Sequence, residues 1–435
     1  MRILHLIDAD SPQATPTTLA MLGDALGRLG AIEQRVYLLG GAPLERAARA
    51  AGLTNFIRVG VPMGSAVLGW RAIRREFRRQ DEGEFDLIHC WSIGALTLAT
   101  MLFRSTPRLL TLTVPPTSRG TRWLRVLTSD IAGGAGGAGR AAILPISNAI
   151  RRTLLMGGVN PLGVHVVRPA IDMSRVAPSG RARNELRERW KIEDPKAVIV
   201  GIASDPPSAA DAVATMIVCR YAMETLLVEG IDVRVVMHPM QRRRLQAKDA
   251  LRALGGLRLL IDEPQIAEPW NILPGCDIVL ALGTQGPVRV RNMDAIVTSS
   301  QRPVTQDIGH GYLGAGGSAE SGGGGLSLLW AMASNVPIVG EATYGISEIV
   351  EDRHSALLTK PGLFRALAHR IRQVITDKQL AWSLRDTARH ECYSFFSRAR
   401  YCDALRAVYE QMAAGQPIEV PAMEVTGGLR FAGRA

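Results

Sequence analysis

Short apolar runs alternate with helical patterns along the first part of the chain. Arg2 to Asp8, Arg35 to Leu39 and Asp86 to Cys90 are compact apolar segments that end in polar or turn residues, as buried strands do. Between the first two, Thr17 to Leu29 carries apolar residues at helical spacing and stops at Gly30. Strands that alternate with helices in this way are typical of parallel α/β sheets.

The same pattern continues through one further strand and helix. Ile143 to Ile146 is an apolar run, and Ser147 after it is a favourable first cap for a helix from Asn148 to Met156 that ends at two glycines. Val164 to Asp172 predicts another strand, which turns at Pro169. The polar stretch from Ser174 to Asp194 predicts a connection between two domains.

A second series of buried strands follows that connection. It comprises Lys196 to Ala203, Val233 to Met237, Leu257 to Ile261 and Asp277 to Leu282. A chain of 435 residues is too long for one ordinary core. The pattern therefore predicts two parallel α/β domains, with a boundary between Asp172 and Lys196.

Two segments carry no regular pattern. Gly283 to Gly325 contains eleven glycines and few apolar residues, so we expect a lid or a poorly ordered insertion that proteases cut early. After a last predicted helix from Ser397 to Ala413, residues 414–435 form a tail that we expect to be loose.

The stretch from Leu326 to Leu358 is the most informative part of the chain. Leu326 to Ser334 predicts an apolar helix, and Pro337 to Gly340 predicts a buried strand. Gly345 then predicts a turn, and Ser347 begins a short helix that has Glu348 in its first turn. A carboxylate is favourable at that end of a helix for structural reasons alone.

These segments together resemble a GT-B glycosyltransferase of family 4, also called group 1. The resemblance rests on the stretch just described and on DLIHCWS from Asp86, ILPISNAIRRTLLMGGVNP from Ile143 and LAWSLRDTARHECYSFFS from Leu380. It implies two facing doubly wound parallel-sheet (Rossmann-like) domains in the GT-B arrangement. Residues 1–175 would form the acceptor side, 196–390 the nucleotide-sugar domain with its insertion at 283–325, and 391–413 a helix that returns to the first domain.

The activity that the resemblance implies is transfer of a sugar from a nucleotide-sugar donor, with retention, to a saccharide or lipid-linked acceptor. No metal and no other cofactor is implied. Asp8-Ala9-Asp10 has the Asp-x-Asp spacing of a metal site but lacks the context for one.

Two acids of the family's donor site are missing. When the Ala-Met-Ala helix of the family is aligned with Ala331 to Ala333, the two acids fall on Trp330 and Gly322. Neither of these residues has a carboxylate. Glu320, two places earlier, is a weak substitute. The basic residues that the family places after the first strand of the second domain are also absent, because Gly201 to Ala212 contains none.

Other residues match the donor site of the family. Gly324, Gly325, Leu326 and Ser327 stand at the start of a helix, where free backbone amides can bind a phosphate. An equally good interpretation is that these glycines form a flexible connector that leads into a buried helix. Gly345 and Glu348 match the family's third acid and the glycine before it.

In the first domain, the resemblance places two residues at the sugar site. His89 and Trp91 occupy the family's His-x-His positions. Trp91 either stacks on a sugar ring or fills the place of the donor, and a histidine at a strand end more often faces the sheet. The alternatives to a transferase are therefore a catalytically inactive GT-B scaffold that binds a sugar or partner and, less favoured, a nucleotide-sugar epimerase on the same fold.

The net charge of +11 comes almost wholly from arginine. This charge fits a phosphate-bearing ligand, an anionic membrane surface or nucleic acid and does not choose among them. We expect no nucleic-acid partner. The densest basic run lies on a predicted helix with apolar residues on the opposite face. It is either a solvated helix packed on its own domain or a site of peripheral membrane contact. Its basic residues are Arg71, Arg74, Arg75, Arg78 and Arg79.

Five scattered cysteines without a CxxC pair argue against a disulfide framework and against a zinc site. No segment reaches the ~18 apolar residues of a membrane span, and the start lacks the apolar stretch of a signal peptide. We expect a cytoplasmic protein, with peripheral contact at the inner membrane face left open.

Overall fold

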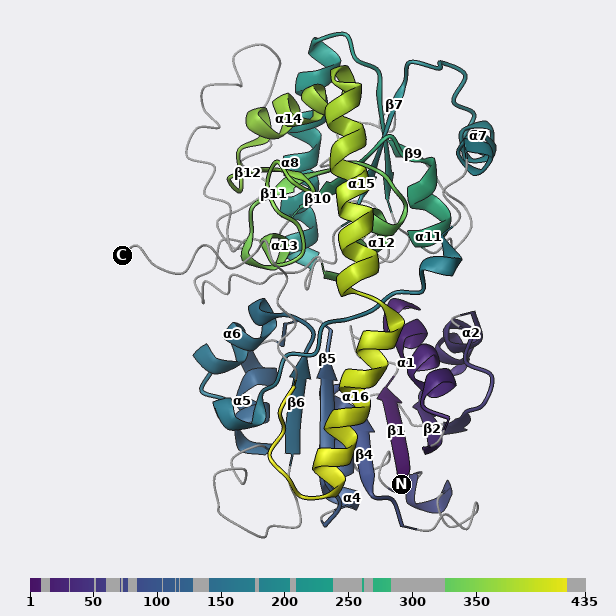
Figure 1. Ribbon diagram of the computed structural model, residues 1–435, viewed down its shortest axis with the longest axis vertical. Coiled ribbons are helices and arrows are strands. Elements are labelled where there is room, and N and C mark those ends of the chain that lie inside the picture. Colours follow the sequence, from purple (N-terminus) through teal and green to yellow (C-terminus); the bar gives the residue numbers. More distant parts are fainter. Residues whose placement is uncertain are drawn as a thin grey trace. The chain divides into compact units, whose positions relative to one another are not determined.

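The structure is a computed structural model of the whole chain. It describes residues 1–8, 16–30, 32–50, 52–59, 71, 73–76, 84–103, 105–113, 115–116, 118–127, 141–176, 180–203, 209–237, 260–261, 269–282 and 325–420. The chain divides into two compact units (Figure 1). Unit 1 comprises residues 1–175 and 390–435, and unit 2 comprises residues 176–389.

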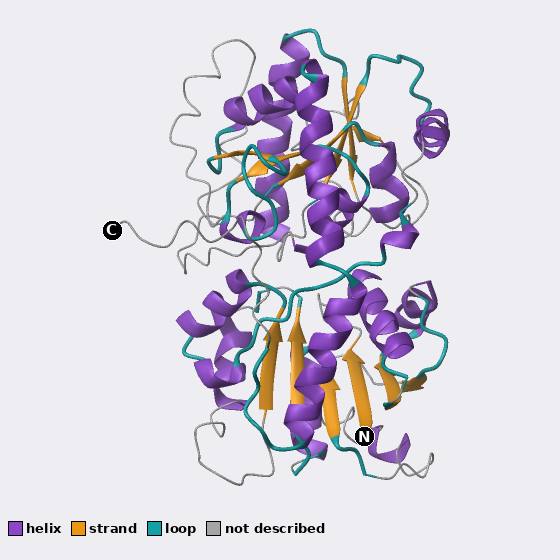
Figure 2. Ribbon diagram, viewed as in Figure 1, coloured by secondary structure: helices purple, strands orange, loops and turns teal. Residues whose placement is uncertain are grey.

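Unit 1 contains a six-stranded parallel sheet in the order β3-β2-β1-β4-β5-β6. The strands are β1 Arg2–Asp8, β2 Glu33–Leu39, β3 Ile57–Val59, β4 Leu87–Cys90, β5 Arg108–Leu112 and β6 Ala141–Pro145. Its helices are α1 Pro16–Arg28, α2 Ala42–Ala50, α4 Ile93–Leu102, α5 Ser118–Leu127, α6 Asn148–Met156 and α16 Arg398–Ala413. Helix α16 lies beside α1 and over β4, so the end of the chain completes the first unit (Figure 2).

Unit 2 repeats this architecture with the sheet order β12-β11-β10-β7-β8-β9. The strands are β7 Val198–Ile202, β8 Val233–Met237, β9 Leu260–Ile261, β10 Ile278–Ala281, β11 Ile338–Glu341 and β12 Leu357–Thr359. The helices are α7 Gly180–Arg189, α8 Ala209–Val228, α11 Pro269–Ile272, α12 Gly325–Ala333, α13 Tyr344–Ser347, α14 Phe364–Thr376 and α15 Lys378–Phe395, the last of which continues into unit 1.

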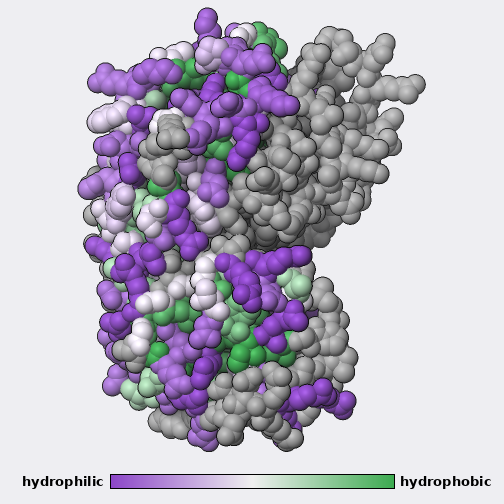
Figure 3. All heavy atoms as spheres, turned by 90° about the vertical axis from the view of Figure 1, so that its right-hand side faces the viewer, coloured by the Kyte–Doolittle hydropathy of each residue, from purple (hydrophilic) through white to green (hydrophobic). Residues whose placement is uncertain are grey.

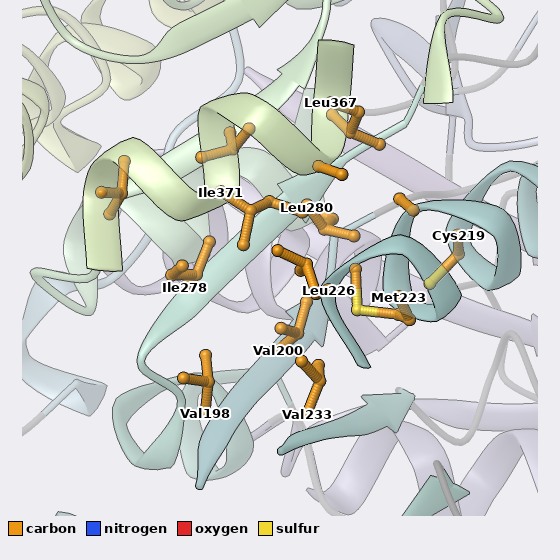
Figure 4. Close-up of a cluster of buried hydrophobic side chains, with 14 of the residues drawn as sticks. Val198, Val200, Cys219, Met223, Leu226, Val233, Ile278, Leu280, Leu367 and Ile371 are labelled. Carbon is orange, nitrogen blue, oxygen red and sulfur yellow. The ribbon is translucent and has the colours of Figure 1, made fainter. Parts of the chain in front are cut away.

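Each unit has its own apolar core. In unit 2, Val200 and Leu280 from the central strands pack with Leu226 of α8 and Ile371 of α14 (Figure 4). In unit 1, Ile7 and Val36 pack with Leu22 of α1. On the face of the molecule drawn in Figure 3, hydrophilic side chains predominate over the described surface. Among the described residues, no helix is long and apolar enough to cross a membrane.

The strand order of each sheet reverses in its middle, between β1 and β4 in unit 1 and between β7 and β10 in unit 2. In doubly wound sheets ligands bind at the carboxyl ends of the strands on either side of this switch point. The two doubly wound parallel sheets that the sequence predicted are confirmed.

Three local expectations were wrong or incomplete. Val164 to Asp172 is extended but forms only an isolated bridge, between Val164 and Ile143, because Pro169 interrupts the segment. Helix α7 lies inside the stretch expected to be a connection. The backbone of Glu419, in the expected loose tail, exchanges two hydrogen bonds with the side chain of Gln411. Residues 283–324 and 421–435 lie outside the described residues.

Candidate functional site

The carboxyl edge of the unit 2 sheet is the first candidate site. The segments that follow β7 and β10 there, residues 204–208 and 283–324, lie outside the described residues. The described part consists of α12, the end of β11 and α13, which are consecutive along the chain. With the C-cap of α13 it contains five of the six residues that the resemblance assigned to donor binding, and the position of one missing acid.

Helix α12 begins at Gly325, where the glycine run ends. Leu326 lies in its first turn, and the Ser327 side chain is buried with 8% exposure. Gly324, Gly322 and Glu320 lie outside the described residues. The start of the helix thus lies within one residue of the predicted Leu326.

Trp330 lies inside unit 2. Its side chain has 0% exposure, and its ring packs against Trp270 of α11 with centroids 4.5 Å apart and an interplanar angle of 49°. The backbone oxygen of Trp330 accepts a hydrogen bond of 2.7 Å from the hydroxyl of Ser334. The indole Nε1 is buried and has no hydrogen-bond partner. A carboxylate at this position would therefore enter an apolar interior.

Helix α13 begins three residues earlier than expected. It covers Tyr344–Ser347, so Gly345 is a buried residue inside the helix and not a turn. Glu348 follows as the C-cap, and its backbone N–H donates to the oxygen of Tyr344 at 3.2 Å. The expectation that Glu348 occupies the first turn of a helix was wrong. A carboxylate at this end opposes the helix dipole, so the dipole does not explain Glu348.

Glu341 is a buried acid that the sequence analysis missed. It ends β11 with 3% exposure, and its Oε1 accepts a hydrogen bond of 2.7 Å from the backbone N–H of Gly362. Gly340 before it has no room for a side chain, because a Cβ would meet the backbone oxygen of Ala281. The signal was available, since an acid directly after a buried strand of a parallel sheet lies at the carboxyl edge.

In unit 1, His89 and Trp91 are interior residues. Their exposures are 0% and 1%, and their rings stack with centroids 4.5 Å apart. His89 Nδ1 lies 2.7 Å from the hydroxyl of Tyr409 on α16, and His89 Nε2 lies 2.8 Å from Thr111 Oγ1 on β5. His89 thus faces the sheet, as a histidine at a strand end more often does, and the ring of Trp91 packs against it inside unit 1.

A second histidine extends this buried network. The indole N–H of Trp91 donates to Nδ1 of His5 at 3.2 Å, which leaves Nε2 of His5 as the donor to Gln34 Oε1 at 3.0 Å. The amide of Gln34 in turn donates to the backbone oxygens of Leu26 and Leu29. Burial lowers the pKa of His5 to about 4, although its hydrogen bond with Gln34 acts in the opposite direction.

Both histidines of this network are neutral at physiological pH. Burial also lowers the pKa of His89 well below its usual value, and the neighbouring His5 adds to that effect. Burial raises the pKa of the Tyr409 hydroxyl, which therefore stays protonated. The network joins β1, β2, β4 and β5 to α16 and so fixes the last helix of the chain on the first sheet.

The described residues contain neither a cluster of metal-binding side chains nor an activated thiol. They contain no group of three or more histidine, cysteine, aspartate or glutamate side chains that could hold a metal ion. All five cysteines are free and buried. Burial raises the pKa of Cys219, Cys276 and Cys392 to about 12, so these thiols are not activated as nucleophiles. Asp8 lies against Gly94 at the start of α4, and Asp10 lies outside the described residues.

The basic helix predicted around Arg71 is described only in part. Residues 73–76 are helical, with Ile73 fully buried and Arg74 and Arg75 exposed. Arg71 is also exposed, and Arg78 and Arg79 lie outside the described residues. The described turn therefore shows an apolar contact to its own unit and a basic outer face.

Comparison with known proteins agrees with this geometry. Residues 294–391 match the family of glycosyl transferases, group 1. An Anabaena protein, Alr3699/HepE, solved in complex with UDP and glucose, has a TM-score of 0.66 at 17% identity, covering 95% of this chain and 100% of that one. The chain has the GT-B fold, with a group 1 segment in unit 2. No curated protein sequence matches it.

Two other GT-B relatives extend the comparison at lower identity. A glycosyltransferase from Rickettsia africae has a TM-score of 0.61 at 13% identity, covering 94% of this chain and 98% of that one. Sucrose-phosphate synthase from Thermosynechococcus elongatus has a TM-score of 0.61 at 12% identity, covering 96% and 100%. At such identities the structural likeness establishes the fold alone, so the function of this GT-B protein has to be argued from its own residues.

Within the GT-B fold, the group 1 segment contains the residues that the structure brings together. The start of α12, Gly345 and Glu348 all belong to unit 2 and to the matched range. His89 and Trp91 belong to unit 1, where their rings stack and His89 lies within hydrogen-bonding distance of Tyr409 on α16. Unit 2 is therefore the part of the molecule in which a donor site can be sought.

Proposed function

We propose that unit 2 binds a nucleotide-sugar donor and that the protein transfers the sugar, with retention, to a saccharide or lipid-linked acceptor. One observation carries the proposal. The α12, β11 and α13 elements stand in sequence at the carboxyl edge of a doubly wound sheet, inside the segment that matches group 1 glycosyltransferases. The Anabaena relative bound to UDP and glucose supports a nucleoside diphosphate sugar as the donor.

Each described element has a defined role in this proposal. The amides in the first turn of α12 receive the diphosphate, because a helix N-terminus attracts negative charge. Glu348, which is 9% exposed, accepts hydrogen bonds from the hydroxyls of the donor sugar. Neither a metal ion nor a cofactor takes part. The proposed place of action is the cytoplasm or the inner membrane face, with the exposed Arg74 and Arg75 available for a peripheral contact.

A second candidate function is donor binding without transfer. It is favoured by Trp330, which fills the position of a family acid with a fully buried ring. The segment from Gly201 to Ala212, which has no basic residue, favours the same alternative. Loss of cations near a departing diphosphate weakens stabilisation of the transition state, which costs rate more than it costs binding.

The test separates binding from turnover. Calorimetry with a panel of UDP-, GDP- and ADP-sugars measures affinity, and release of the free nucleotide with and without saccharide acceptors measures transfer. Binding with turnover supports the transferase. Binding without turnover in the presence of every acceptor leaves the scaffold, and no binding of any donor overturns both.

The Glu348→Gln substitution tests the assigned contact. We expect it to weaken donor binding by about 1 to 3 kcal/mol, the scale of a lost charge-assisted hydrogen bond. Glu351→Gln is the matched control, because Glu351 lies three residues further on and is exposed. Unchanged affinity in a folded Glu348→Gln protein would make Glu348 a structural residue.

A further inference from the structure

Helix α5 of unit 1 presents an unusual outer face. Only Thr121 and Leu124 of this helix are buried. Trp123 is 48% exposed and Val126 is 57% exposed, although both are apolar. On a helix wheel these two residues lie opposite the buried pair, together with the exposed Arg119 and Arg122. The face that points away from unit 1 is therefore both apolar and cationic.

Helix α6 adds to this face. The two helices are neighbours, since a Cβ at Gly157 would meet the side chain of Thr121 and a Cβ at Gly158 would lie 3.3 Å from Cδ of Arg125 (Figure 1). Met156, the last residue of α6, directly precedes this contact and is 71% exposed. We refer to Arg119, Arg122, Trp123, Val126 and Met156 as the α5–α6 face.

The charge of the surrounding sequence is one-sided. Residues 91–171 contain nine arginines, no lysine and a single acidic residue, Asp130. Helix α5 has three arginines and no acid, and α6 has two arginines and no acid. Salt bridges that would neutralise such a surface are absent from the described residues of α5. A positive surface of this kind attracts anionic groups.

We propose that the α5–α6 face docks the protein on an anionic lipid surface. Arginines attract the acidic headgroups, and a tryptophan beside aliphatic side chains enters the boundary between headgroups and acyl chains. A nucleic acid would use the arginines but gain little from Val126 and Met156, which favours lipid over nucleic acid. With no spanning helix among the described residues, the attachment is peripheral.

This surface differs from the basic helix around Arg71. There the described apolar residue, Ile73, has 0% exposure and packs within unit 1, and the exposed described side chains are arginines. On α5 the apolar residues themselves face outward. The α5–α6 face thus combines both parts of a membrane anchor, electrostatic attraction and apolar insertion.

The experiment uses the full-length protein and lipid vesicles. Co-sedimentation measures partitioning onto vesicles of phosphatidylcholine alone and of phosphatidylcholine mixed with phosphatidylglycerol. We expect partitioning onto the mixed vesicles only. The double variant Arg119→Gln, Arg122→Gln should reduce it about 30-fold, because each arginine near an anionic surface contributes about fivefold.

Matched controls keep the test specific. Arg46→Gln together with Arg365→Gln removes the same charge from exposed positions elsewhere and should leave partitioning within about twofold of wild type. Trp123→Ala should weaken binding to mixed vesicles, whereas Trp382→Ala, which removes a 56% exposed tryptophan from α15, should not. Circular dichroism of each variant confirms folding.

Three results would overturn the proposal. They are equal partitioning of wild type onto both kinds of vesicle, no partitioning onto either, and an equal loss in the control variants. None of the substituted positions belongs to the proposed donor site in unit 2. Failure of lipid binding therefore leaves the calorimetric test of donor binding unaffected, and failure of donor binding leaves this test unaffected.

Discussion

Two buried tryptophans, one in each unit, are held in opposite ways. Trp91 is 1% exposed and Trp330 is 0% exposed, so both rings are removed from water. The N–H of Trp91 donates to Nδ1 of His5, and that bond continues through Gln34 to the backbone of unit 1. The N–H of Trp330 has no partner, and its ring contacts Trp270 instead.

The difference shows what each position contributes. A buried N–H without a partner costs ~1 to 3 kcal/mol, so Trp330 is retained by packing and not by polar recognition. Trp91 belongs to a polar network in which each ring nitrogen of His5 and His89 has a neighbour within hydrogen-bonding distance. The stability of unit 1 should therefore depend on the protonation of its histidines and on the Tyr409 hydroxyl. The stability of unit 2 should depend on the volume and charge of the side chains in its core.

The largest effect should come from a charge placed at Trp330. Trp330→Glu combined with Gly322→Glu recreates the two acids of the family pattern, but the first carboxylate enters a fully buried apolar site. Because a buried unpaired carboxylate and the lost ring both destabilise, we expect a loss of at least ~4 kcal/mol. Urea unfolding followed by circular dichroism measures it.

An exposed tryptophan provides the control for this variant. Trp382→Glu places the same charge on α15 at a side chain that is 56% exposed, and it should change stability by less than ~0.5 kcal/mol. A stable double variant that binds a nucleotide sugar more tightly than wild type would mean that position 330 can turn towards a ligand.

The second effect is a pH dependence confined to unit 1. The folded pKa of His5 is about 4, below the ~6.5 of an unfolded chain, so the unfolded chain takes up a proton first as pH falls. The contribution of neutral His5 to the free energy of unfolding is fully present above pH ~6.5 and decreases as the pH falls below that value. Below pH ~4 this contribution decreases no further. Between pH 7 and pH 5 the loss from His5 should be ~2 kcal/mol, and His89 acts in the same direction.

Hydrogen exchange can locate this loss. His5 lies on β1 and His89 on β4, and both side chains are buried inside unit 1. Amides of β1 and β4 should therefore lose protection between pH 7 and pH 5 before those of β7 and β10 do. Equal loss in both sheets would place the acid sensitivity outside the histidine network.

The two sheets were predictable from the sequence, whereas the burial and the hydrogen-bond partners of the tryptophan and histidine side chains were not. Apolar runs such as Val233 to Met237 are continuous because parallel strands are buried on both faces, and this pattern needs no knowledge of neighbours. The bond from His89 to Tyr409 joins residues 320 positions apart, so only the fold brings them together. Glu348 was placed at the wrong end of its helix because helix boundaries in short segments depend on tertiary packing.

The third effect concerns the hydroxyl that joins α16 to the sheet. Tyr409→Phe removes the hydrogen-bond partner that His89 Nδ1 has among the described residues and so leaves a buried nitrogen unsatisfied. We expect a loss of ~1.5 kcal/mol at pH 7, measured by urea unfolding. Tyr393→Phe, at a position on α15 where the side chain is 50% exposed, should lower stability by less. An unchanged Tyr409→Phe protein would show that the network adds no stability.

The smallest effect is the difference in stability between two proteins that carry the same Trp-to-Phe substitution at different positions. Trp91→Phe and Trp330→Phe each remove the same part of a buried ring, so the cavity terms are similar. Trp91→Phe also leaves His5 Nδ1 without its donor, whereas Trp330→Phe removes an N–H that had no acceptor. Trp91→Phe should therefore be the more destabilising by ~1 kcal/mol in urea unfolding at pH 7. If Trp330→Phe proved equally or more destabilising, its indole N–H would have an acceptor, and the contrast between the two units would disappear.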